Sequence, residues 1–387
     1  MKFTYFLKGL VLAFFLLSCN ANEDINQLEE VTANKADEKT LQSPDLQGRW
    51  FCNIQKKIKH RGIYINNFEN DILGNFVEET KLLMWCNRNN FKEITLYTVS
   101  SILNSPAQKE KLTTFVIQAH LFYGIKVSFS AASKEAIIKI KNYQMELNSP
   151  LEKCDGIFTE YEFWNPNTSG VNYNYYKNDM LGVLENLAPS ISQKFKNNLY
   201  VYNFSDASGQ YTDNQVLEDI VDFIKRKRNK HRLVLVNYRA NAQNFPTDIN
   251  SNYYKRIQDL ANIAAAKNVK IKVIVLYMTR NDVASSMYNY FADNGLGNDF
   301  EDAFISFKNG FKNSTIQNKR YLNLFGYQIY RYSDAKLAKP LGNGFNFDVS
   351  EEDEDDYYED EYDDEYEEEE GDEDDEEEED DEEDDDD

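Results

Sequence analysis

Apolar and polar positions along the chain follow two alternating patterns. Short runs rich in β-branched and aromatic residues predict strands, and longer runs with apolar residues three and four positions apart predict helices. The expected strands lie at residues 62–68, 93–99, 125–131, within 153–164, and at 199–204, 232–238, 270–278 and 327–332. The expected helices lie between them, at residues 71–87, 107–123, 134–147, 178–196, 214–228 and 252–267, and within 282–291 and 299–311.

This regular alternation predicts βαβ units and a parallel sheet. Eight strands favour closure into a (β/α)8 barrel of the TIM type, within a domain at residues 47–347. An open, doubly wound sheet is the competing fold. Only residues 335–347 remain for an eighth helix, so either the N-terminal segment covers that gap or the barrel is irregular there.

The stretch at residues 153–164 carries the strongest candidate chemistry. Period-two alternation places Phe158, Glu160 and Glu162 on one face of the expected strand, with the two glutamates about 7 Å apart. In a partly buried site two such carboxyls do not both ionise freely, so one is expected to keep its proton near neutral pH and to serve as a general acid. From spacing alone, a strand end with solvated glutamates is the more frequent arrangement.

The same stretch resembles the fourth-strand signature of glycoside hydrolase family 18, the chitinases and endo-β-N-acetylglucosaminidases, written D-G-x-D-x-D-x-E. Asp155, Gly156 and Glu162 match the signature. Glu160 stands where the family has an aspartate that orients the substrate's acetamide group, and Phe158 replaces another aspartate.

Two further strand ends are similar to family motifs in the expected order. Ser130 matches the serine of S-x-G-G, with Ala132 and Ser133 in place of the glycines. Tyr238 matches the tyrosine of M-x-Y-D, and Arg239 replaces the acid.

The resemblance implies substrate-assisted hydrolysis of a β-linkage to N-acetylglucosamine, without a cofactor or a metal ion. Glu162 would protonate the leaving oxygen and the substrate's acetamide would attack the anomeric carbon, while Glu160 and Tyr238 orient that acetamide. The implied substrate-binding residues are Asp155, Ser130, Trp164, Tyr161 and Arg239. A non-catalytic barrel that binds glycans, or that serves in adhesion or as a scaffold, is the alternative.

Aromatic residues support a glycan ligand, because sugar faces stack on aromatic rings. Those on or just after expected strands are Tyr64, Tyr97, Tyr161, Trp164, Tyr238, Tyr277 and Tyr330. Each is equally well explained as a core or loop residue.

Other chemistries find little support in the sequence. His60, His120 and His231 are the three histidines and lack metal-ligand spacing, and no glycine-rich phosphate loop is present. The lysines and arginines are spread along the chain, which argues against a nucleic-acid partner.

The N-terminus predicts export and a lipid anchor. Lys2 and Lys8 precede an apolar run at residues 10–17 that is too short to span a bilayer, and Leu16-Leu17-Ser18-Cys19 resembles a bacterial lipobox. We expect residues 1–18 to be a signal peptide, Cys19 to carry lipid and residues 19–46 to be a polar tether. The predicted location is the cell envelope, at the outer membrane or the cell surface.

Three cysteines remain once Cys19 is assigned to lipid. Cys52, Cys86 and Cys154 would all lie toward the N-terminal ends of the strands in a barrel. A disulfide bond between Cys52 and Cys86 is the hypothesis.

The C-terminal residues 348–387 form a segment of different composition. Residues 351–387 contain 32 acidic residues and no basic one, so the rest of the chain carries +7 of the overall net charge of −25. Such a tail is expected to be disordered. Besides solubility, it has two candidate roles, which are binding a basic protein surface and loosely collecting cations.

Overall fold

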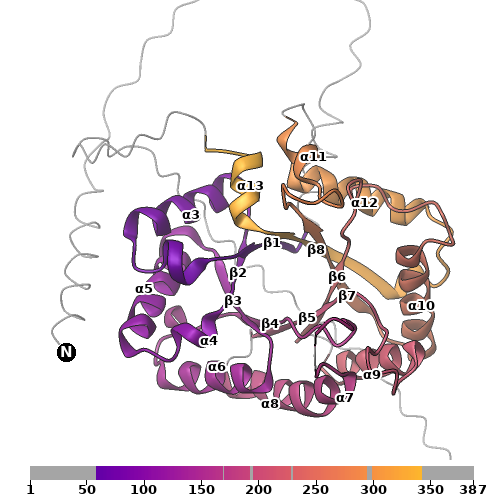
Figure 1. Ribbon diagram of the computed structural model, residues 1–387, viewed down its shortest axis with the longest axis horizontal. Helices are drawn as coiled ribbons and strands as arrows, with labels where there is room; N and C mark the ends of the chain where they lie inside the picture. The colour runs from indigo at the N-terminus through magenta and orange to yellow at the C-terminus, as the bar shows by residue number, and fades with distance from the viewer. Residues whose placement is uncertain (1–57, 169, 192–194, 228–229, 294–298, 342–387) are drawn as a thin grey trace, which may run out of the picture. The chain divides into compact units, whose positions relative to one another are not determined.

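The computed structural model describes residues 58–168, 170–191, 195–227, 230–293 and 299–341. Within these ranges eight parallel strands pair in sequence order and close into a barrel, which confirms the predicted fold class (Figure 1). The strands are β1 (His60–Ile65), β2 (Glu93–Leu96), β3 (Lys126–Ala131), β4 (Gly156–Thr159), β5 (Lys196–Val201), β6 (His231–Val236), β7 (Ile271–Met278) and β8 (Leu322–Tyr330).

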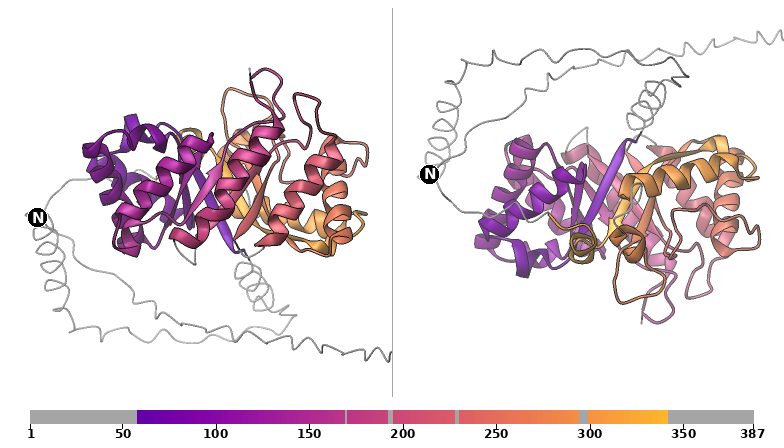
Figure 2. Two further views of the ribbon diagram at one scale, coloured as in Figure 1. Left: turned by 90° about the horizontal axis from the view of Figure 1, so that it is seen from below. Right: turned by 90° about the horizontal axis from the view of Figure 1, so that it is seen from above.

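Helices connect successive strands and pack around the barrel, as the side views in Figure 2 show. The longer ones are α3 (Phe76–Arg88), α5 (Pro106–Tyr123), α6 (Lys134–Glu146), α8 (Gly182–Ile191), α9 (Asp213–Arg226), α10 (Asn252–Ala266) and α12 (Phe300–Asn313). The shorter ones include α4 (Val99–Ile102), α7 (Tyr173–Tyr175), α11 (Tyr288–Ala292) and α13 (Tyr332–Ala338). None of the helices in the described ranges is both long and apolar enough to cross a membrane.

Sequence signals explain where these helices begin and end. In α5, the Ser105 hydroxyl accepts a hydrogen bond from the Gln108 amide, and Pro106 occupies the first turn. Gly124 ends α5 in the left-handed region, with φ of 57°.

The eighth unit is short, as expected from the sequence. After β8, helix α13 has only seven residues. The Trp85 indole of α3 donates a hydrogen bond of 2.7 Å to the Lys339 carbonyl, which fastens the chain beyond α13 to the barrel. The predicted boundaries at residues 47 and 347 lie outside the described residues, as do Cys19, Cys52, the polar tether and the acidic tail.

The seam between the first and last strands depends on a glycine. A Cβ atom at Gly326 of β8 would lie 1.9 Å from the carbonyl oxygen of His60 in β1. Only glycine permits the two backbones to approach this closely.

The barrel interior contains a buried ionic cluster toward the N-terminal ends of the strands. The Glu93 Oε2 atom lies 3.1 Å from both His60 Nδ1 and Arg232 Nη1. Its Oε1 atom accepts hydrogen bonds from the Ser128 hydroxyl at 2.7 Å and the Asn198 amide at 3.4 Å. Burial opposes ionisation of Glu93, but the charges of His60 and Arg232 outweigh it and hold its pKa well below the usual range.

Candidate functional site

A cavity of about 750 Å³ opens at the C-terminal ends of the strands. This is the end at which TIM barrels carry their active sites. Its lining includes Tyr64, Asn66, Asn67, Tyr97, Ala132, Phe158, Glu160, Tyr161, Glu162, Thr168, Gly170, Val171, Tyr200, Tyr238, Leu276, Met278, Arg280, Tyr330 and Arg331. Of the predicted catalytic and substrate-binding residues, it brings together Glu160, Tyr161, Glu162 and Tyr238.

Glu160 directly follows β4 and lines this cavity. Its amide donates to the Ala131 carbonyl at 2.9 Å, which continues the pairing between β3 and β4. Its Oε2 atom is buried, and no described residue forms a hydrogen bond to it. Burial, with a contribution from the negative charge of Glu162, raises the pKa of Glu160 to about 8. Glu160 therefore keeps its proton at neutral pH.

Glu162 has a different environment. Its Oε2 atom accepts a hydrogen bond of 2.9 Å from the Asn165 amide, and its Oε1 atom accepts one of 3.3 Å from the Tyr200 hydroxyl. Both partners donate hydrogen bonds toward it. The two glutamates thus differ, because the buried Oε2 atom of Glu160 has no hydrogen-bond partner among the described residues, whereas both carboxyl oxygens of Glu162 have one.

Tyr238 joins this group through Tyr200. The two hydroxyls hydrogen-bond to each other, and burial raises the pKa of both phenols. Both therefore remain neutral donors at physiological pH. Tyr200 had no place among the sequence-predicted site residues, although its position inside β5 makes it the direct partner of Glu162.

Aromatic rings form much of the lining of the cavity. Tyr64 lies between Phe158 and Tyr330, with ring centroids 5.8 and 5.4 Å apart respectively. Phe158 also contacts Tyr200 at 6.0 Å, and Tyr238 contacts Tyr330 at 6.4 Å. A ligand that enters the cavity therefore meets aromatic faces and edges from β1, β4, β5 and β8.

The structure places two predicted substrate-binding residues away from this cavity. Asp155 precedes β4 at the opposite end of the barrel, where its Oδ2 atom accepts hydrogen bonds from the Val127 amide and from His120 Nε2, both at 2.8 Å. Arg239 donates instead to Asn237 at 2.8 Å and to the Asn244 carbonyl at 2.7 Å. The structure therefore shows Asp155 and Arg239 bonded to neighbouring backbone and side chains outside the cavity, and their predicted role in substrate binding stays a prediction.

Trp164 and Ser130 also lie outside the lining of the cavity. Trp164 is 9% exposed and packs against Phe163 and Tyr200, at 4.8 and 5.5 Å between ring centroids. It supports a wall of the cavity from behind. Ser130 is buried in β3 opposite Phe158 in the register. Neither side chain lines the cavity, and the predicted role of both in ligand contact stays a prediction.

Two remaining sequence expectations have different outcomes. Tyr277 is fully buried and packs against Phe307 of α12, because its place in β7 directs it toward the helices. Cys86 is a buried free thiol in α3, and Cys52 lies outside the described residues, so the predicted disulfide bond stays a prediction.

The opposite wall of the cavity carries two arginines that sequence reasoning missed. Arg280 follows β7, and its Nε and Nη2 atoms contact the two carboxylate oxygens of Asp282 at 2.9 and 2.5 Å. Arg331 follows β8, and its Nε atom bonds to the buried carboxylate of Asp334. The position of Arg280 just after the strand predicted at residues 270–278 is a signal that could have identified it, whereas Arg331 fell inside the strand predicted at residues 327–332.

Across the described ranges, no cluster of three or more histidine, cysteine, aspartate or glutamate side chains could hold a metal ion. The cavity offers carboxyl, phenol and guanidinium groups, so acid–base chemistry and hydrogen bonding are what its own residues can supply.

Comparisons with known proteins add nothing beyond the fold. No protein-family model and no curated protein matches the chain. A chitinase from Rhizomucor miehei is similar in structure with 11% identity over 70% of this chain and 94% of that one, at a TM-score of 0.40. The probable 3-DHS dehydratase AsbF from Bacillus anthracis shares 10% identity over 72% and 96% of the two chains, at a TM-score of 0.39. D-psicose 3-epimerase from Clostridium cellulolyticum shares 11% identity over 70% of this chain and 84% of that one, also at a TM-score of 0.39. At these values the likeness carries no argument about function.

Proposed function

We propose that the barrel binds a glycan in the cavity and hydrolyses a β-linkage to N-acetylglucosamine. One observation carries the proposal, namely that a carboxyl protonated at neutral pH and a carboxylate stand together on the wall of an aromatic-lined cavity. Environments that separate the protonation states of two neighbouring carboxyls are typical of acid–base catalysis.

In this mechanism Glu160 is the proton donor. Its proton passes to the glycosidic oxygen as the bond to the anomeric carbon breaks, and the oxygen of the substrate's acetamide forms a new bond to that carbon. Glu162 accepts the acetamide N–H and stabilises the positive charge of the cyclic intermediate. A water molecule then opens the ring and returns its proton to Glu160.

The two glutamates therefore exchange the roles that the family resemblance implies. That resemblance places the acid at Glu162, whereas the burial of Glu160 and the two donors on Glu162 favour the reverse. Tyr200 and Tyr238 hold Glu162 in position through their linked hydroxyls. Substrate-assisted hydrolysis needs no second catalytic carboxylate, so the pair at the end of β4 is sufficient.

The proposal is tested by incubating the full chain with a chromogenic β-N-acetylglucosaminide, chito-oligosaccharides and a broad glycan array. We expect release of reducing ends from at least one β-linked N-acetylglucosamine substrate. Phe158 occupies the position of a family carboxylate, which favours a second candidate, a non-catalytic glycan-binding barrel. Binding on the array without hydrolysis would establish that candidate, and the absence of both would exclude both functions.

The proposed location is the cell envelope, through lipid on Cys19. In a bacterial host fed labelled palmitate, the wild-type chain should incorporate label and sediment with membranes, whereas Cys19→Ala should remain an unlabelled precursor. Cys154→Ala serves as the control for loss of a different thiol. Labelling of Cys19→Ala at the wild-type level would remove the lipoprotein hypothesis.

A further inference from the structure

We propose that Arg331 and Arg280 form an oxyanion-binding wall of the cavity, so that the glycan it accepts carries a carboxylate, sulfate or phosphate group. This inference deepens the proposed function, because it names the class of glycan that the same cavity takes. It rests on the position, the support and the free donors of the two guanidinium groups.

In the closed barrel β8 lies four strands from β4 in either direction, so Arg331 stands opposite Glu160 and Glu162. Tyr64 bridges the two sides, through its ring contacts of 5.8 Å to Phe158 of β4 and 5.4 Å to Tyr330 of β8. A sugar over these rings has the carboxyl pair at one edge and the arginines at the other.

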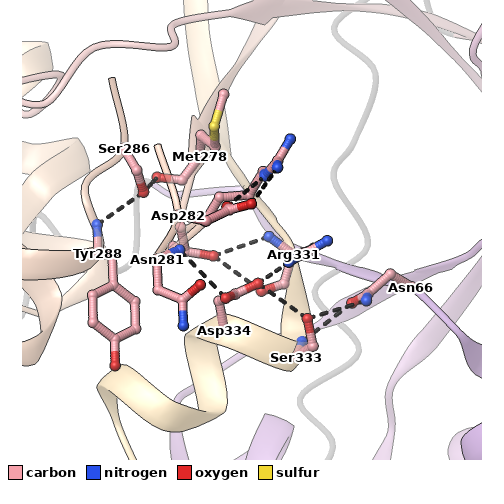
Figure 3. A network of polar contacts seen from close by, with 11 residues as sticks. Asn66, Met278, Asn281, Asp282, Ser286, Tyr288, Arg331, Ser333 and Asp334 are labelled. Atoms are coloured by element: carbon pink, nitrogen blue, oxygen red, sulfur yellow. Dashed lines mark hydrogen bonds and ion pairs between the residues drawn. The ribbon is translucent and has the colours of Figure 1, made fainter. Parts of the chain in front are cut away.

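A network of hydrogen bonds supports Arg331, as Figure 3 shows. Asp334 has a side chain only 4% exposed, and it binds the Nε atom of Arg331 while also accepting hydrogen bonds from the Ser333 hydroxyl and the Asn281 amide, at 3.1 and 3.3 Å. Asn66 of the cavity lining in turn accepts a hydrogen bond of 3.2 Å from the Ser333 amide. The carboxylate thus orients the guanidinium from behind, since Asp334 does not contribute to the cavity lining.

Several donors of the two arginines are left for a ligand. Within the described part of the chain, no residue accepts a hydrogen bond from the Nη1 or Nη2 atoms of Arg331, or from Nη1 of Arg280. Guanidinium groups bind carboxylate, sulfate and phosphate oxygens in pairs of hydrogen bonds. Two such groups at one wall can therefore hold an oxyanion from two directions.

Local charge favours the same placement of the ligand. The carboxyl and guanidinium residues of the lining are Glu160, Glu162, Arg280 and Arg331. Asp282 and Asp334 pair with the two arginines, so an oxyanion is held at this wall by the remaining guanidinium donors at short range rather than by a long-range positive field.

The test compares matched neutral and acidic probes by calorimetry, at low salt and neutral pH. Methyl β-D-glucoside is compared with methyl β-D-glucuronide for a carboxylate, and N-acetylglucosamine with its 6-sulfate and 6-phosphate for ester oxyanions. We expect at least one acidic probe to bind about tenfold more tightly than its neutral partner, with the preference reduced in 0.5 M salt. Which acidic probe gains most identifies the oxyanion.

Arg331→Gln should reduce this preference to below about threefold while leaving the neutral probe's affinity unchanged, and Arg331→Lys should restore only part of it because an ammonium lacks the paired donors. Arg280→Gln, at a more exposed position, gives a second readout. Arg226→Gln removes a surface ion pair with Glu185 outside the cavity and is the matched control.

Equal binding of each probe pair, binding of no probe, or a preference unchanged in both Arg331→Gln and Arg280→Gln would overturn the inference. Because calorimetry needs no turnover, a failure of the hydrolysis proposal is seen separately.

Discussion

Glu160→Gln is expected to lower turnover of a β-N-acetylglucosaminide by at least about a hundredfold while leaving ligand binding nearly unchanged. The amide has almost the same shape as the protonated carboxyl but cannot transfer a proton to the glycosidic oxygen. Its replacement removes a contribution made only in the transition state. Single-turnover kinetics together with calorimetric binding separate the two effects, and Glu146→Gln, a surface carboxyl paired with Lys109, is the control.

The pH dependence of turnover provides the sharper test of which glutamate is the acid. Activity that needs protonated Glu160 should be steady through neutral pH and fall as pH rises through about 8, where its proton is lost. Burial and the charge of Glu162 both raise this pKa, so the residual activity of Glu162→Gln should begin to fall at a lower pH. If Glu160→Gln keeps the rate and the alkaline fall, the acid is Glu162 instead.

Glu93→Gln is expected to destabilise the barrel by about 3–5 kcal/mol, the usual cost of removing one partner from a buried ion pair. The substitution leaves the Arg232 guanidinium in the barrel interior without its carboxylate, although the shape of the side chain is kept. Urea unfolding followed by circular dichroism measures the loss. Glu185→Gln, which removes the more exposed ion pair with Arg226, should cost less than about 1 kcal/mol.

A double substitution distinguishes an unpaired charge from lost packing. Glu93→Leu combined with Arg232→Met removes both charges and supplies apolar groups of similar length, so it should recover much of the stability lost in Glu93→Gln. A double variant as unstable as the sum of its single variants would show that the cluster acts through its hydrogen bonds to Ser128 and Asn198.

The strands and helices were predictable because their signal is periodic. The predicted helix at residues 252–267 and strand at 270–278 fall within one residue of α10 and β7 at each end. The errors lie where periodicity ends. Residues 97–99 were expected to extend the second strand, but β2 ends at Leu96 and Val99 begins helix α4.

The eighth strand shows how such an error conceals a site residue. It was expected at residues 327–332, whereas β8 spans Leu322–Tyr330. The predicted strand therefore contained Arg331, and the rule that directs attention to residues just after strands passed over it. The start of β8 was missed because the exposed Asn323 interrupts the apolar pattern there. The pairing of this part of β8 with β7 is also irregular, with a register shift between Val273 and Ile274.

At the site, alternation placed Glu160 and Glu162 in the same cavity but could not order their pKa values. Sequence spacing does not show which carboxyl lacks a hydrogen-bond partner. The partners of Glu162 are Tyr200, which comes from the next strand, and Asn165, which comes from the loop after β4. Trp164 and Arg239 lie outside the lining of the cavity for a related reason, since their side-chain directions depend on turns beyond the strand ends, where period two no longer applies.

The seam between β1 and β8 has a consequence for how the chain folds. The hydrogen bond from His60 to Gln328 joins residues 268 positions apart, and β1 pairs with β8 from His60 to Ile63. Of the eight strands, β1 is synthesised first, and one of its edges stays unpaired until β8 has been made. Contacts this distant in sequence form slowly because a long loop must be closed first. The strand that seals the barrel also brings Arg331 to the cavity, so a growing chain acquires its closed barrel and its complete binding wall in the same late step.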